Sequence, residues 1–71
     1  MCIIALKSMT YAFKAKKALD DSLIESEIIK LEPQMTKKGC AYGISFNCIN
    51  LENVQCALKK FSIRYSEIVR M

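Results

Sequence analysis

The pattern of apolar and polar positions along the chain predicts six elements, in the order strand, helix, strand, strand, helix, strand. A nearly unbroken apolar run predicts the first strand, because a central strand presents little polar surface. Alternation between residues 41 and 48 predicts a strand with Tyr42, Ile44 and Phe46 on one face. Helical spacing of apolar residues predicts the two helices. The expected bounds are 2–7, 9–19, 26–31, 41–48, 51–61 and 62–69.

Each predicted helix follows a residue whose side chain can cap it. Ser8 precedes the first helix and Asn50 precedes the second, and both residue types accept hydrogen bonds from free amides at a helix N-terminus. We expect the apolar stripe of each helix to face the sheet, while Lys14 and Lys17 face water. The stripes comprise Met9, Ala12, Phe13 and Leu19 in the first helix, and Leu51, Val54, Leu58 and Phe61 in the second.

This order of elements is that of the ferredoxin-like split βαβ sandwich (βαββαβ). The predicted class is therefore α+β, with a four-stranded antiparallel sheet, two helices on one face, and a single domain over residues 1–71. Right-handed crossovers would place the first and third strands side by side in the centre. We expect these two strands to be parallel, with Cys2 and Cys40 at one end of the sheet and Cys48 at the other.

Composition narrows the classes of protein to which the chain can belong. It has 71 residues, 52% of them apolar, and a net charge of +4 spread along its length. No apolar run approaches the roughly 20 residues of a membrane helix, and no signal-peptide core is visible. We therefore expect a cytoplasmic protein that binds neither membrane nor nucleic acid. So short a chain has a small core, and a homodimer or a partner would add stability.

Four cysteines are the most informative residues. Without a secretory signal, Cys2, Cys40, Cys48 and Cys56 are expected to be reduced thiols. No pair has the C-x-x-C spacing and histidine is absent, so the spacing gives no support for a zinc site. We expect no metal and no cofactor. Cys48 is expected to pack in the core, and Cys56, beside the apolar stripe of its helix, is expected to be inert.

Cys40 is the best candidate for chemistry, because it follows a long loop over residues 32–39. A loop of this length beside a rigid sheet is more often functional than a short turn. Cations near a thiol favour the reactive thiolate, and glycines allow backbone amides to approach it. The surrounding candidates for binding are Lys37, Lys38, Gly39 and Gly43. The alternative is that Cys40 is a small apolar residue at the start of a strand.

Cys2 is a candidate resolving thiol for Cys40, since both are expected at the same end of the sheet. The alternative is that Cys2 only fills the first strand. No histidine base, nucleophile elbow, phosphate-binding loop or pair of carboxylates on one helix face is visible. The sequence therefore indicates a protein that is not an enzyme.

Several short motifs in the chain match a known pattern. They are the strand-to-helix turn over residues 7–12, the apolar run 28–31 with Pro33, Cys40 after the loop, and the closing residues 68–70. On these motifs the chain resembles a small bacterial family of selenium/sulfur (Se/S) carrier-like proteins, over nearly its whole length. The resemblance implies that Cys40 is the carrier residue. The family usually has glycine directly after this cysteine, where this chain has Ala41.

The leading hypothesis is a carrier that receives sulfur or selenium on Cys40 as a persulfide-type adduct and passes it to an acceptor protein. Its partners would be a sulfur or selenium donor protein and an acceptor protein. The alternative is a non-catalytic interaction or regulatory module that dimerises or docks through its sheet. A third possibility is a redox sensor that pairs Cys2 with Cys40.

Overall fold

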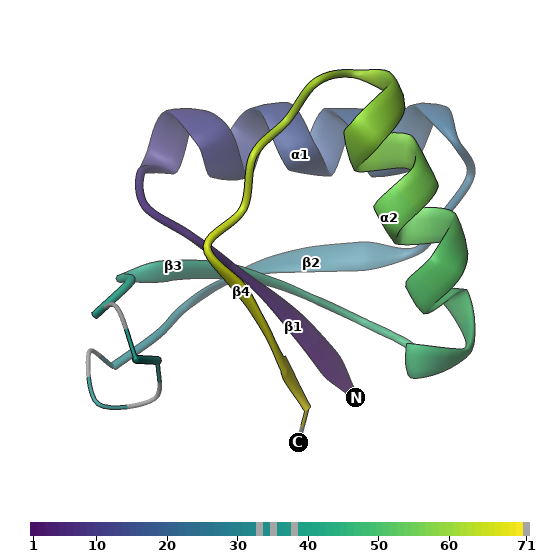
Figure 1. Ribbon diagram of the computed structural model, residues 1–71. Helices are drawn as coiled ribbons and strands as arrows, with labels where there is room; N and C mark the ends of the chain where they lie inside the picture. Colours follow the sequence, from purple (N-terminus) through teal and green to yellow (C-terminus); the bar gives the residue numbers. More distant parts are fainter. Residues whose placement is uncertain (33, 35, 38, 71) are drawn as a thin grey trace.

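Four strands form one antiparallel sheet, and two helices cover one of its faces (Figure 1). The computed structural model describes residues 1–32, 34, 36–37 and 39–70. The predicted α+β class, with one four-stranded antiparallel sheet and two helices, is confirmed. The strands are β1 (Cys2–Leu6), β2 (Ser26–Lys30), β3 (Tyr42–Phe46) and β4 (Glu67–Arg70); the helices are α1 (Met9–Asp21), α2 (Leu51–Lys60) and the short 3-10 helix η2 (Cys48–Asn50).

The strand order is β2-β3-β1-β4, so β1 and β3 are the central strands. They run antiparallel, with Cys2 opposite Phe46. The expectation that they are parallel is therefore wrong. The reason is topological: α1 returns the chain so that β2 runs in the same direction as β1, and the following connection reverses it into β3. As a result, Cys40 lies at the end of the sheet where β1 finishes, and Cys2 and Cys48 lie at the opposite end.

Small side chains set the packing of α1 on the sheet. Ser8 caps this helix as predicted, since its Oγ accepts a hydrogen bond from the Tyr11 amide at 3.3 Å. The expected stripe is wrong for Met9 and Phe13, which are 38% and 60% exposed. Alanine methyl groups let the helix approach the sheet closely, and Phe13 falls on the opposite side of the helix. The buried residues of α1 are Ala12, Ala15, Ala18 and Leu19.

The second helix starts in a different way from the one predicted. Asn50 makes no side-chain capping bond; instead, Oδ1 of Asn47 accepts a hydrogen bond from the Ile49 amide at 3.0 Å and starts η2. One short turn of 3-10 helix therefore precedes α2. The buried face consists of Val54, Ala57 and Leu58, while the predicted stripe member Phe61 is the C-terminal capping residue and is 45% exposed.

Apolar side chains gather on both faces of the sheet. The main core lies between sheet and helices and includes Ile44 and Phe46, with Tyr42 packed against it, as the alternation predicted. The last strand is shorter than predicted and begins at Glu67. A second cluster lies on the face away from the helices and consists of Ile3, Ala5, Leu31 and Cys40, with Ile29 and Val69 against it. This second cluster brings the candidate thiol into contact with the sheet.

Within the described ranges, no helix has the length and apolar character needed to cross a membrane.

Candidate functional site

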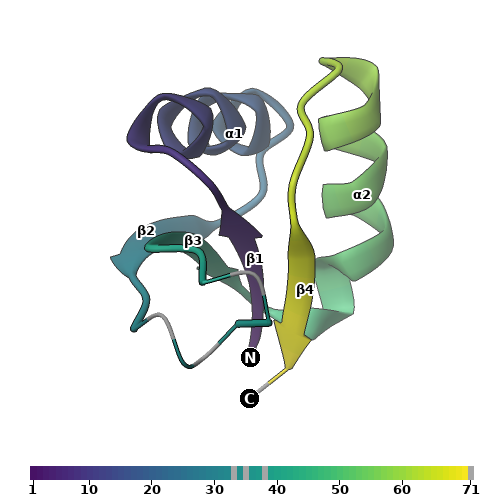
Figure 2. The same ribbon diagram turned by 60° about the vertical axis from the view of Figure 1, so that its left-hand side comes forward.

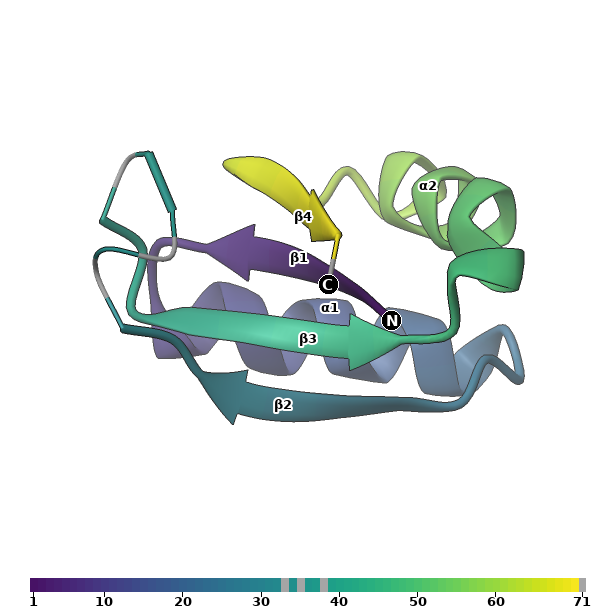
Figure 3. The same cartoon turned by 90° about the horizontal axis from the view of Figure 1, so that it is seen from below.

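The segment that joins β2 to β3 is here called the β2–β3 loop, and its described residues are 31–32, 34, 36–37 and 39–41. These residues lie beyond the end of β1 and reach toward β4 (Figure 3). At its base, the Leu31 amide donates a hydrogen bond to the Ala41 carbonyl at 2.8 Å. Farther along, the Lys37 amide donates to Oε1 of Glu67 at 2.7 Å. Figure 2 shows the same loop in front of β1 and β3. The first of these bonds therefore closes the base of the loop, and the second ties the loop to β4.

Cys40 is buried within this arrangement, with 3% of its surface exposed. It packs in the second cluster with Ile3, Ala5 and Leu31. Its amide donates a hydrogen bond to Oγ1 of Thr36 at 2.7 Å. The loop therefore does not leave this thiol open to donors, because it places Cys40 in an apolar cluster on the sheet.

Of the two lysines before Cys40, the structure describes Lys37 alone. Lys37 is exposed, and the interaction that holds it is made by its backbone amide. Lys38 lies outside the described residues. Stabilisation of a Cys40 thiolate by these lysines therefore stays a prediction.

The two glycines have different structural roles. Gly39 has φ +67° and is exposed, so it makes the left-handed turn that leads into Cys40. Gly43 is buried in β3, where an added Cβ would lie 2.8 Å from Ile3 Cγ2 and 2.8 Å from Leu31 Cδ1. Gly43 thus allows the second cluster to close over the strand, which is a packing role and does not require a ligand.

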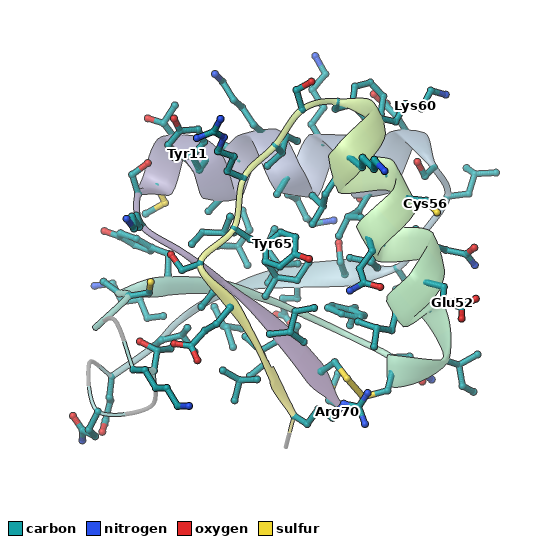
Figure 4. The ribbon with its side chains drawn as sticks, in the orientation of Figure 1. Tyr11, Glu52, Cys56, Lys60, Tyr65 and Arg70 are labelled. Carbon is teal, nitrogen blue, oxygen red and sulfur yellow. A yellow bond between two sulfur atoms is a disulfide. The ribbon has the colours of Figure 1, made fainter. Side chains whose placement is uncertain are left out.

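Cys2 and Cys48 form a disulfide, with their Cα atoms 5.1 Å apart (the yellow bond in Figure 4). The antiparallel pairing explains it, because Cys2 is opposite Phe46 and Cys48 follows two residues later. The expectation of four reduced thiols is wrong here. Cys48 is exposed rather than in the core. Cys2 is at the other end of the sheet from Cys40, so the structure does not place it as a resolving thiol.

Cys56 is the accessible free thiol, and it lies on the outward face of α2 (Figure 4). Its expected position beside the apolar stripe is wrong. Cys56 is two positions after Val54 and two before Leu58, so it is rotated about 200° around the helix axis from each of these buried residues. A helical projection of the sequence is therefore sufficient to predict that Cys56 is exposed.

Sequence reasoning missed Thr36 and Glu67, two side chains that accept hydrogen bonds from described amides of the β2–β3 loop. Thr36 is four residues before Cys40, a spacing at which a hydroxyl can accept a backbone hydrogen bond. Glu67 gives no such local signal, because it is 30 residues from Lys37.

The chemistry that this arrangement can offer is that of a single thiol. In the described part of the chain, no three histidine, cysteine, aspartate or glutamate side chains gather where they could hold a metal ion. Cys40 would act as a nucleophile toward sulfur once a donor can reach it.

A family model described as "Putative Se/S carrier protein-like" matches residues 1–70. The chain belongs to this family. No curated protein and no solved structure gives a significant match. Membership of a Se/S carrier-like family indicates that the chain acts together with partner proteins. It also agrees with the resemblance inferred from the sequence motifs.

Proposed function

We propose that this chain is a non-enzymatic carrier that holds sulfur or selenium on Cys40 and delivers it to an acceptor protein. Membership of the Se/S carrier-like family supports this function. The observation that carries the proposal is the state of the cysteines: Cys2 and Cys48 are joined, while Cys40 is a free thiol at the position that the family resemblance assigns to the carrier.

Loading would proceed by sulfur transfer between thiols. The Cys40 thiolate attacks the outer sulfur of a persulfide on the donor, forming a new S–S bond at Cys40. The donor's S–S bond breaks, and the donor leaves as a thiolate while the proton stays on the outer sulfur. Delivery repeats this step with an acceptor thiolate as the attacking group. Each step is redox-neutral and uses no cofactor.

Access to Cys40 is the physical requirement of this proposal. A donor's persulfide cannot reach a side chain that is 3% exposed. Loading therefore involves local opening in which Cys40 separates from Thr36 and Leu31. The bond between the Lys37 amide and Glu67 opposes such opening, because it ties the same loop to β4.

Neighbouring residues would assist the open form. The exposed ammonium of Lys37 would favour the Cys40 thiolate and attract an anionic donor surface. Lys38 would add a second positive charge to the same segment of the chain. The left-handed turn at Gly39 would leave backbone amides free to approach the adduct.

We also assign the chain to the ferredoxin-like split βαβ sandwiches. The support is the element order βαββαβ, the sheet order β2-β3-β1-β4 and the placement of both helices on one face (Figure 1).

A second candidate function is a non-catalytic interaction module that dimerises or docks through its sheet. The burial of Cys40 favours this function, since a buried thiol packed among Ile3, Ala5 and Leu31 also serves as an ordinary core residue. In that case Cys40 would be dispensable for partner binding.

Mass spectrometry separates the two candidates. The protein is incubated with a cysteine desulfurase and cysteine without any further reductant, and is then alkylated and mapped. The map also reports whether the Cys2–Cys48 disulfide is intact. The carrier predicts one added sulfur on Cys40 in the wild type and in Cys56→Ser, and none in Cys40→Ser. An adduct that persists in Cys40→Ser, or that maps to the exposed Cys56, would overturn the carrier function and favour the interaction module.

A further inference from the structure

A hollow of about 260 Å³ lies between the start of α1 and the segment that leads into β4. Figure 4 shows two of its lining residues, Tyr11 on α1 and Tyr65 on that segment. The segment is fixed beside β1, because the Ser66 amide donates a hydrogen bond to the Ala5 carbonyl at 2.9 Å. The lining consists of Lys7, Tyr11, Arg64, Tyr65 and Ser66.

The charge of this hollow is positive and uncompensated. Lys7 and Arg64 are both exposed cations, and the described lining contains no carboxylate. Among the described side chains, the one ion pair joins Lys16 to Asp20, and this pair neutralises neither Lys7 nor Arg64. The Lys14 ammonium lies 5.8 Å from the centre of the Tyr11 ring and adds a third positive charge nearby.

The polar groups around these cations are suited to an oxyanion. Tyr11 and Ser66 are lining residues with a hydroxyl group, and hydroxyls can donate to an anionic oxygen. Arginine and lysine form short charge-assisted hydrogen bonds with phosphate, and arginine can do so through two N–H groups at once. The first turn of α1 contains no acidic residue, so the positive end of the helix dipole adds to the same potential.

We propose that this hollow binds a phosphate-type oxyanion, either free phosphate or a phosphomonoester group of a small molecule. Lys7 and Arg64 pair with the dianion from two different segments of the chain. Two separate cations favour a dianion over a singly charged carboxylate, because each can hold its own oxygen. The inference uses no property of Cys40, so it stands or fails separately from the carrier function.

Titration with sodium phosphate, followed by amide NMR of the whole chain at constant pH, tests the proposal. We expect saturable shifts of the Tyr11 and Ser66 amides that sodium chloride and sodium acetate at matched ionic strength do not reproduce. Shifts that follow ionic strength alone, or equal saturation by acetate, would overturn the phosphate site.

Variants locate the binding. Lys7→Gln and Arg64→Gln should each weaken phosphate binding roughly tenfold, the effect expected from losing one charge-assisted pair. Lys59→Gln, which removes another exposed cation from α2 outside the hollow, should leave the affinity unchanged. Amide spectra of the free variants report whether each one is folded. Equal affinity in the wild type and in the folded Lys7→Gln/Arg64→Gln double variant would refute the assignment.

Discussion

One hydrogen bond, from the Cys40 amide to the Thr36 hydroxyl, contributes to holding the candidate thiol in place. The bond is buried, so its loss would leave a backbone donor without a partner unless water entered. The sequence predicted a functional Cys40 after a loop but not its burial. The burial of Cys40 also depends on its contact with Leu31 and on the hydrogen bond from the Lys37 amide to Glu67. Neither contact can be predicted from the residues adjacent to the thiol.

Replacing Thr36 by valine should favour the open form of the loop. Valine keeps the shape of the side chain but cannot accept the hydrogen bond, at a cost of about 1–3 kcal/mol. Alkylation of Cys40 in the native protein should therefore accelerate at least about fivefold, as measured by peptide mapping against Cys56 in the same sample.

Thr36→Ser is the matched control, because it keeps the hydroxyl acceptor. Its alkylation rate at Cys40 should stay close to that of the wild type. If Thr36→Val leaves the rate at Cys40 unchanged, the hydrogen bond does not control access to the thiol.

At the level of helices and strands, the sequence predicted the order and type of every main element. The errors concern which face or end of an element a residue occupies. Phe13 was placed on the sheet as an apolar member of a helically spaced stripe, whereas three alanines and Leu19 form the packed face of α1. Cys2 and Cys40 were placed at one end because the direction of the central strands was misjudged. Face and direction depend on the partner element, which the local pattern does not contain.

The packing of β3 against its neighbours gives a prediction for Gly43→Ala. The added methyl group would lie 2.8 Å from Ile3 Cγ2 and Leu31 Cδ1 and 3.1 Å from the Ile4 carbonyl oxygen. Such overpacking should lower the free energy of unfolding by about 1–3 kcal/mol, measured by urea denaturation.

Ser45→Ala is a suitable comparison, because Ser45 occupies the same strand and sheet face and the change adds no atom. Its effect should stay below about 1 kcal/mol. A Gly43→Ala protein as stable as Ser45→Ala would mean that the second cluster is not tightly packed around β3.

For the molecule as a whole, the two apolar clusters on opposite faces of the sheet have different roles. The main core, with the helices and the Cys2–Cys48 disulfide, holds the fold together, because the disulfide connects the start of β1 to the start of η2. The smaller cluster holds the β2–β3 loop and Cys40 on the opposite face. Local opening of the smaller cluster can therefore expose the thiol while the main core stays intact.

The most direct test compares two rates in the native protein. One is the rate at which sulfur from a desulfurase and cysteine appears on Cys40, followed by site-resolved mass spectrometry. The other is the rate of global unfolding, extrapolated to water from urea. A carrier loaded through local opening predicts sulfur on Cys40 faster than the protein unfolds. Loading of Cys40 no faster than global unfolding, or only in denaturant, would show that the thiol is a core residue and would contradict the carrier account.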